Sequence, residues 1–210
     1  MHGDLDLPWL PPFPPEVLAA AGLLDRDISA IRNVLAAYDR TNAMALIALS
    51  TLLLRLEDEP LTRHAASSHS EAPCERPSAI PLPALLGMTD LAPGTAELVL
   101  TLNHLGVRRG DPILASMYRH LAHWTGYLAL AWAMVAPLDT DGSLEQAIAD
   151  VVAKARVRAA RVATRLYVPA ERISPATRAT IRSAVEPFTG DVIAKMVVIC
   201  AVLRAATGPA

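Results

Sequence analysis

The chain has 210 residues, of which 52% are apolar, 19% charged and 4% aromatic, and its formal net charge is −2. A chain of this length with so many apolar residues can fill a sizeable core, which excludes a wholly disordered protein. The near-neutral charge gives no overall attraction to nucleic acid or to an anionic membrane, so neither is expected as a partner. Alanine, leucine and valine dominate and no alternating β-type segment occurs, which predicts an all-α fold.

Cysteine usage and the longest apolar runs indicate the compartment. The two cysteines, Cys74 and Cys200, form neither a disulfide framework nor a metal-binding spacing, which favours a reducing environment. The acidic, proline-rich start resembles no secretory signal, and the apolar runs 127–138 and 196–203 are shorter than the ~20 residues of a membrane span. The sequence therefore predicts a cytoplasmic protein outside the membrane, with no metal and no cofactor.

Composition divides the chain into four segments that together make one compact domain. Residues 1–15 are predicted to form a proline-rich arm whose Trp9, Leu10 and Phe13 pack onto a helical body. Residues 16–56 form a first, incomplete helical unit that opens with a short helix ended by Gly22. Residues 57–94, rich in proline and serine, form a linker or surface loop, and residues 95–210 form a second helical unit.

The stretch 25–56 carries an apolar seam with one polar member, Asn42. The seam residues are spaced alternately three and four apart, as on one face of a helix. An amide in such a seam must find hydrogen bonds or incur a cost of roughly 1–3 kcal/mol. The helix is expected to break near Asp39, with Thr41 or Asn42 capping a second helix. Alternatively, Asn42 sets helix pairing or belongs to a functional site.

A partial internal copy supports the expected break. Residues 31–38 are echoed by residues 181–188, and each copy is followed by a polar step and a long apolar helix. The second copy has Pro187, Gly190 and Asp191 where the first has Ala37, Arg40 and Thr41, which indicates a helix, a stop and a new helix. Both copies are therefore predicted to be helix pairs, so that one structural unit is present at least partly twice.

The second unit begins with a helix over 95–105, closed by Gly106. A longer helix is predicted from about Ile113 to Val135, capped by Asp111. One of its faces would be polar enough to line a pocket, although core packing explains it equally well. The residues of this face are Met117, His120, Trp124 and Leu128.

Two further helical stretches complete the chain. A capping-box pattern at Ser143 and Gln146 starts a helix expected to reach Tyr167. Its basic stripe is typical of a solvated face, with an acidic partner as the weaker reading, and comprises Lys154, Arg158, Arg161 and Arg165. Ser174 with Pro175 starts the closing helix pair, which carries Lys195 within an apolar run.

Several of these stretches resemble the group I 2-haloacid dehalogenases, the all-helical type that acts on both enantiomers. The resemblance lies in residues 16–23, 28–49, 112–137 and 174–204. It implies two helical repeats in pseudo-twofold relation with the active site between them. In that family an aspartate and an asparagine position a water that displaces halide directly from carbon. The asparagine corresponds to Asn42, but the aspartate falls on Met117, after Ser116, and a thioether takes no proton.

These observations predict a haloacid-dehalogenase-like enzyme that acts on a small organic acid or a related substrate by displacement or proton transfer and has lost the parent reaction. Its expected catalytic residues are Asn42 and His120, since His120 lies one turn beyond Ser116 and titrates near neutral pH. Its expected substrate-binding residues are Ser116, Met117, Tyr118 and Trp124. The alternative is a non-catalytic helical module for ligand binding or assembly, in which Asn42 is a cap and the aromatic face is core.

Members of that family have a further helical half-unit ahead of the part that corresponds to residue 16 onward, so the first repeat is expected to lack its opening helices. Either the segment from Trp9 to Phe13 or another subunit would cover the surface that those helices cover in the family. The apolar fraction of 52% is high, so a homodimer arranged about a twofold axis is predicted.

Overall fold

The computed structural model describes residues 11–57, 81–107, 110, 112–164 and 173–208. Within these ranges every regular element is helical and no strand occurs, which confirms the all-α prediction. The helices are α1 (Pro15–Ala20), α2 (Asp25–Leu56), α3 (Pro93–His104), α4 (Ser116–Leu121), α5 (Thr125–Thr140), α6 (Ser143–Ala163), α7 (Pro175–Pro187) and α8 (Ile193–Thr207). Two short turns accompany them, the 3₁₀ turn η2 (Met88–Asp90) and the π-helical segment η4 (Phe188–Val192).

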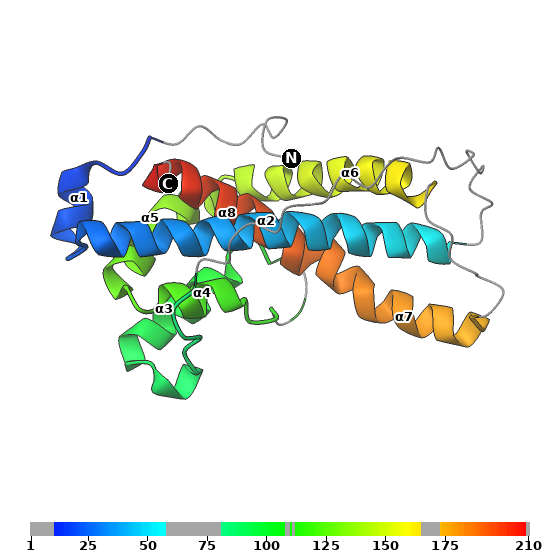
Figure 1. The fold of residues 1–210 in the computed structure, drawn as a ribbon, viewed down its shortest axis with the longest axis horizontal. Helices are drawn as coiled ribbons and strands as arrows, with labels where there is room; N and C mark the ends of the chain where they lie inside the picture. Colours follow the sequence, from blue (N-terminus) through cyan, green and yellow to red (C-terminus); the bar gives the residue numbers. More distant parts are fainter. Residues whose placement is uncertain (1–10, 58–80, 108–109, 111, 165–172, 209–210) are drawn as a thin grey trace.

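Helix α2 is the long axis of the molecule, with 32 residues in one unbroken helix (Figure 1). The predicted break near Asp39 and the predicted caps at Thr41 or Asn42 are therefore wrong. The polar residues satisfy themselves without interrupting the helix. The hydroxyl of Thr41 donates to the carbonyl of Ala37 at 2.9 Å, and the carboxylate of Asp39 forms an ion pair with Arg204.

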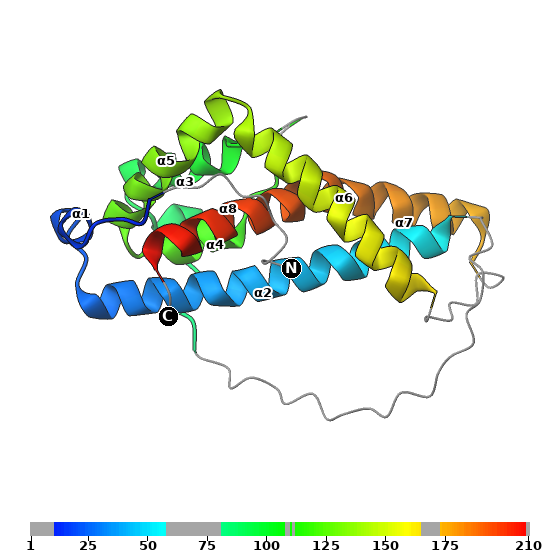
Figure 2. The same cartoon turned by 90° about the horizontal axis from the view of Figure 1, so that it is seen from above.

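The core forms where α2, α6 and α8 pack against one another (Figures 1 and 2). Helix α8 is apolar almost all round, and most of its residues are buried, as expected for a central helix. Helix α6 is amphipathic and buries an alanine-rich stripe that lets the helices approach closely: Ala147, Ala155, Ala159 and Ala163. The core cluster also takes in residues of α1 and of α3 to α5.

The closing pair is joined through a π-helical segment. Residues Phe188–Val192 continue the helical path from α7 into α8, so the predicted stop after Pro187 is wrong. Pro187 has no N–H to donate to a helical hydrogen bond. The helix widens to a π-helix after this residue and continues instead of ending. The two sequence copies therefore differ in local structure, and a pseudo-twofold relation between the halves stays a prediction.

The helix predicted over 113–135 is two helices. Helix α4 ends at Leu121, and the N–H of Trp124 bonds back to the carbonyl of Leu121 at 2.9 Å before α5 starts. Gly126 then lies against the carbonyl of Ala21, a close approach that leaves no room for a Cβ atom. The turn thus places α5 against α3 and against the end of α1. Asp111, the predicted cap, lies outside the described residues.

Other predicted helix ends fared differently. Ser174 accepts a hydrogen bond from the N–H of Thr177 at 3.1 Å, which confirms it as the cap of α7. The capping box at Ser143 is wrong, because Gly142 is the N-cap and Asp141 accepts from the N–H of Ser143 at 2.8 Å. Helix α6 ends at Ala163, and residues 165–172 lie outside the described part.

The arm packs where it is described. The N–H of Phe13 donates to the carbonyl of Ala206 at 2.8 Å, and its ring meets that of Tyr127 edge-on at 6.3 Å. Trp9 and Leu10 lie outside the described residues. The phenol of Tyr127 bonds the Thr207 hydroxyl at 2.7 Å, so the arm, α5 and the end of α8 form one packed corner.

Candidate functional site

The predicted site residues come from α2, α4 and the turn before α5. Asn42 lies in the middle of α2 and faces the core side of the seam. Ser116, Met117, Tyr118 and His120 all belong to the short helix α4. Trp124 precedes α5 and is not on the same helix as His120, so their predicted common face does not exist.

Tyr38 and His120 form the central contact between α2 and α4. The phenol oxygen of Tyr38 lies 2.7 Å from Nδ1 of His120, and the two ring centroids are 5.6 Å apart at an angle of 54°. Burial raises the pKa of Tyr38, and a hydrogen bond from the Ser116 side chain opposes that rise. The structure thus brings together Tyr38, Ser116 and His120. Sequence reasoning placed Tyr38 in the apolar seam and gave it no role in a site.

His120 is held in its neutral form near pH 7. Burial lowers the pKa of His120 below its usual 6.5, and His123 and Arg119 beside it lower the pKa further, while a hydrogen bond to the backbone of Pro83 favours the charged form. A proline backbone has no N–H and can only accept, so His120 donates there. We therefore infer that the Tyr38 phenol donates to Nδ1 of the neutral ring.

The segment over α4 is fixed by side chains on either side of His120. Arg119 donates from Nε to the carbonyl of Leu86 at 2.6 Å, and Nε2 of His123 bonds the carbonyl of Ala84 at 2.8 Å. These contacts hold the extended residues 81–87, part of the predicted linker, against α4.

Asn42 lies one helical turn beyond Tyr38 on the same face of α2, about 6 Å along the axis. Its amide nitrogen is buried and has no hydrogen-bond partner. An unmatched buried N–H of this kind costs roughly 1–3 kcal/mol, which makes it a candidate for contacting a ligand. Among the described residues, no hydrogen bond joins Asn42 to His120 or Ser116.

Met117 and Tyr118 lie in the core, with 1% and 0% of their surfaces exposed. The phenol of Tyr118 has no hydrogen-bond partner, and burial raises its pKa, as does the neighbouring Cys200. A ligand would reach either side chain only by displacing core residues. Burial also explains why an apolar thioether suits position 117.

Trp124 is directed to a different part of α2. Its indole N–H donates to Oδ1 of Asp27 at 3.2 Å. Asp27 precedes Tyr38 by eleven residues, which is about 16 Å along the helix. Trp124 therefore ties α5 to the start of α2 and does not lie beside the pair of Tyr38 and His120.

Asp39, the carboxylate nearest to Asn42 in the sequence, faces α8. It is 3% exposed and pairs with Arg204. It lines an open groove of about 520 Å³ together with Arg40, Met44 and Arg158. Because Asp39 and Tyr38 are neighbours in a helix, their side chains diverge by about 100°, and Asp39 does not supply a base to His120.

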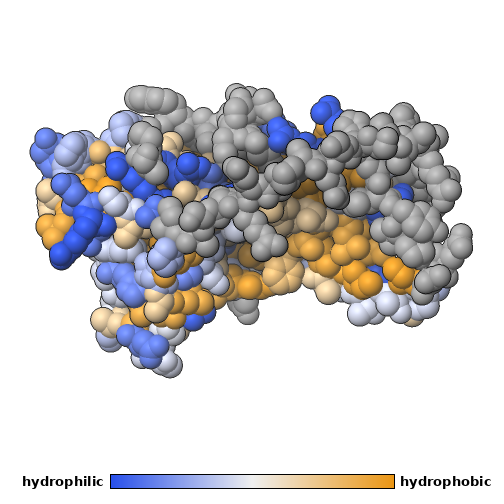
Figure 3. All heavy atoms as spheres, in the orientation of Figure 1, coloured by the Kyte–Doolittle hydropathy of each residue, from blue (hydrophilic) through white to orange (hydrophobic). Residues whose placement is uncertain are grey.

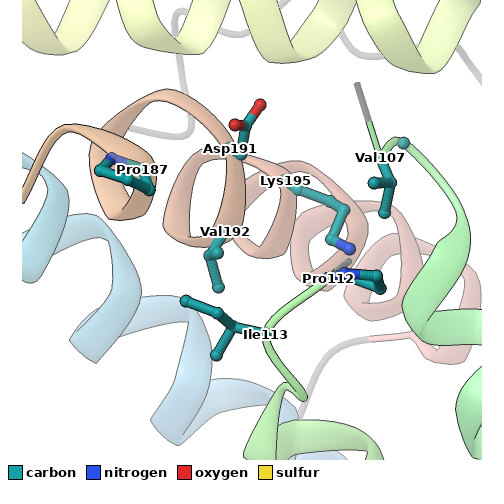
Figure 4. Close-up of a pocket in the computed structure, with 8 residues that line it drawn as sticks. Val107, Pro112, Ile113, Pro187, Asp191, Val192 and Lys195 are labelled. Atoms are coloured by element: carbon teal, nitrogen blue, oxygen red, sulfur yellow. The ribbon is translucent and has the colours of Figure 1, made fainter. Parts of the chain in front are cut away.

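A second polar position, which sequence reasoning did not assign, is Lys195 of α8. Only 3% of its surface is exposed, and its amine donates to the carbonyl of Asn103 at 2.6 Å. It lines a small cavity of about 90 Å³ between η4 and the chain after α3 (Figure 4). The sequence signal for this position is a single lysine inside an otherwise apolar helical run.

No cluster of metal-binding side chains occurs in the part of the chain that the structure describes. Across the same residues, no helix has the length and apolarity needed to cross a membrane. Two histidines of the predicted linker, His64 and His69, lie outside the described ranges. Of the basic stripe, Arg161 is exposed, whereas Lys154 and Arg158 are partly buried and already make interactions.

Comparison with known proteins adds no relative. No family model matches the chain, and no curated protein or solved structure matches it.

Proposed function

We propose that the protein is a small-molecule enzyme in which Tyr38, Asn42 and His120 act on a small organic acid or a related substrate. The observation that carries this proposal is the 2.7 Å contact between Tyr38 and His120. It joins two of the segments that resemble the haloacid dehalogenases. Asn42, the position of that family's asparagine, lies one turn along the same face of α2.

The geometry suggests how a proton would move. Nδ1 of the His120 ring contacts the Tyr38 phenol, and the backbone of Pro83 favours the charged form of the ring. A substrate or water proton would therefore pass to the Tyr38 oxygen as the phenol gives its own proton to Nδ1. The lowered pKa of His120 keeps the ring neutral and able to accept at pH 7. The free N–H of Asn42 would hold the reacting water or a carboxylate oxygen.

This site differs from a 2-haloacid dehalogenase in its base. Met117 stands where the resemblance calls for an aspartate, and it is buried. General-base assistance contributes typically 10²–10⁴-fold, so displacement of halide by the family mechanism is not expected. Halide release from 2-chloropropionate at rates typical of that family would contradict this part of the proposal.

A screen of small carboxylic acids tests the proposal directly. We expect at least one acid to raise the melting temperature of the wild-type protein, and Asn42→Leu and His120→Gln to lose that shift while remaining folded. His104→Gln is the matched control, because His104 is exposed on α3 and bonds the carbonyl of Leu100 in its own helix. Equal shifts in all four proteins would refute a site at Asn42 and His120.

A second candidate is a non-catalytic helical module for ligand binding or assembly. The observation that favours it is the complete burial of Met117 and Tyr118, two of the predicted substrate contacts. In that case Tyr38 and His120 simply fasten α4 to α2. Ligand binding with no turnover of any acid in the screen would select this candidate.

We also propose a homodimer and a cytoplasmic location, which stay predictions from the sequence. Several apolar side chains stand exposed, among them Met44 on α2 at 64% and Val157 on α6 at 57%. Figure 3 shows apolar surface over the C-terminal half of α2. Such a surface supports pairing with a second copy.

A further inference from the structure

The cavity beside Lys195 is built from four parts of the chain. Helix α7 supplies Pro187, the π-helical segment η4 supplies Asp191 and Val192, and α8 supplies Lys195. The chain after α3 supplies the remaining lining residues, which are Gly106, Val107, Pro112 and Ile113. Figure 4 shows the amine of Lys195 extending toward Pro112, while the carboxylate of Asp191 points away from it.

Gly106 makes room for the lysine. It adopts a left-handed backbone conformation with φ of +68°, and its N–H donates to Oδ1 of Asp139 at 2.8 Å. A Cβ atom there would lie 3.3 Å from Cδ of Lys195 and 3.0 Å from Cδ1 of Ile148. The glycine therefore lets the lysine stem pass and brings the amine to the Asn103 carbonyl.

The amine is buried without a carboxylate partner. No ion pair joins Lys195 to an acidic group of the described chain, and its amine donates a hydrogen bond to the carbonyl of Asn103. Burial lowers the pKa of Lys195 to about 8, although Asp191 and Asp139 nearby favour the charged form. With this pKa, about 10% of the amine is neutral at pH 7, compared with less than about 0.1% for an ordinary lysine.

Residue choice supports a chemical role. The chain has 19 basic residues, and only two of them, Lys154 and Lys195, are lysines. Arginine keeps its charge when buried, whereas lysine loses its proton and becomes a nucleophile. A chain that uses arginine almost everywhere has placed one of its two lysines in the core, against a cavity.

We propose that Lys195 is a nucleophilic amine that forms an imine with a small, uncharged aldehyde or ketone bound in this cavity. The neutral amine adds through its lone pair to the carbonyl carbon, which makes a C–N bond while the C=O π electrons go to oxygen, and transfer of one amine proton to that oxygen gives a carbinolamine. A proton taken up from solvent then lets the hydroxyl leave as water, which breaks the C–O bond and gives the protonated imine. The cavity of about 90 Å³ limits the ligand to a small molecule.

The walls of the cavity are mostly apolar, which favours an uncharged ligand. This inference concerns a cavity separate from the pair of Tyr38 and His120, and does not depend on the proposed function. Simple capping of α3 through its Asn103 carbonyl is the competing role, and it predicts no reaction at the amine.

Reductive trapping tests the proposal on the full chain. The protein is incubated at pH 7 with propionaldehyde and cyanoborohydride, which delivers hydride to the imine carbon and makes the adduct permanent. Peptide mass spectrometry then compares Lys195 with Lys154 in the same molecule. We expect Lys195 to be alkylated at least about tenfold faster, with the ratio falling as the pH approaches 10. Equal rates, or modification of Lys154 alone, would overturn the proposal.

Three controls test whether the cavity is the cause of the fast reaction at Lys195. The bulkier benzaldehyde should lose the preference for Lys195, and denaturation in guanidinium should make the two lysines equivalent. Lys195→Arg retains a cation for the Asn103 carbonyl but forms no imine, so its folded protein should lack the fast adduct. Persistence of a fast adduct in Lys195→Arg, or of the preference in guanidinium, would show that the cavity is not its cause.

Discussion

The phenol of Tyr38 in α2 contacts Nδ1 of His120 in α4 at 2.7 Å, across 82 residues of sequence. The contact fixes the orientation of a neutral imidazole and makes it the natural acceptor for the phenol proton. It also fastens α4, together with the extended residues 81–87 that α4 holds, to α2. One hydrogen bond thus links the packing of α4 to the chemistry proposed for it.

Tyr38→Phe separates these two roles. It removes the hydrogen bond to His120 and keeps the ring packing, so we expect a loss of about 1 kcal/mol of stability, to be measured by urea unfolding. Any turnover found in the acid screen should fall by at least about tenfold, because the relay oxygen is absent. Unchanged turnover would place the proton transfer elsewhere.

His120 should also leave a mark on the pH dependence of stability. Its pKa is lower in the folded chain than the usual 6.5, so the unfolded chain takes up the proton first as the pH falls. Wild-type stability should therefore decline below about pH 6.5, until the folded pKa is passed. Urea unfolding between pH 7 and 5 should show a smaller decline in His120→Gln; an identical decline would contradict the lowered pKa.

Asn42→Leu is expected to keep or raise stability. The amide nitrogen has no partner in the buried seam, so its removal relieves a cost of roughly 1–3 kcal/mol, against which any misfit of the leucine must be set. Binding of an acid found in the screen should be abolished by the same change. A large loss of stability would instead indicate that the amide is satisfied in the folded protein and holds the helices together.

The fold class followed from the sequence because periodic apolar seams and alanine-rich stretches specify helices locally. Helix continuity did not follow. Asp39, Thr41 and Asn42 resemble a cap, yet Thr41 bonds its own helix and Asp39 meets Arg204, which is 165 residues away. Conversely, the apolar run through 113–135 gave no warning of the turn at Trp124. Partners distant in sequence decide such points.

The candidate site was predictable only in part. The resemblance pointed to Asn42 and α4, and helical spacing pointed to His120. The role of Tyr38 was not predictable, because its spacing in α2 is that of a core residue and its partner, His120, lies on another helix. The cavity at Lys195 depends on the π-helical segment and on the backbone of Gly106, neither of which leaves a pattern in the sequence.

Gly126→Ala should destabilise the protein by about 1–3 kcal/mol. A Cβ atom there would collide with the backbone carbonyl of Ala21, which cannot move without shifting the turn after α1. Gly94→Ala in α3 is the matched control. Nothing lies within 4 Å of its added methyl, so it should be neutral or slightly stabilising. Equal melting temperatures for the two variants would contradict the close packing of α1 on α5.

The proposed homodimer is checked by light scattering at micromolar concentration. We expect about twice the chain mass of 22.4 kDa. Met44→Glu should shift the protein toward monomer if the exposed face of α2 forms the interface, whereas Leu100→Glu on α3 is a control at another exposed apolar side chain. A stable monomer of the wild-type protein would refute the dimer.

Lys195 should produce a rise in stability with pH that Lys195→Met lacks. Its folded pKa of about 8 lies below the usual 10.5, so between these values the unfolded chain binds more protons than the folded chain. Stability therefore rises with pH over this window, by up to about 3 kcal/mol relative to Lys195→Met, and is constant on either side.

The difference between the two proteins is the quantity to measure, by urea unfolding from pH 7 to 11. Burial raises the pKa of Cys200 and of Tyr127, and those groups lower stability at high pH in both proteins, so their effects cancel. Lys195→Arg, which stays charged throughout, should show no such rise over Lys195→Met. If the wild type also shows none, the amine is fully hydrated in the folded protein, and the buried lysine that the cavity requires does not exist.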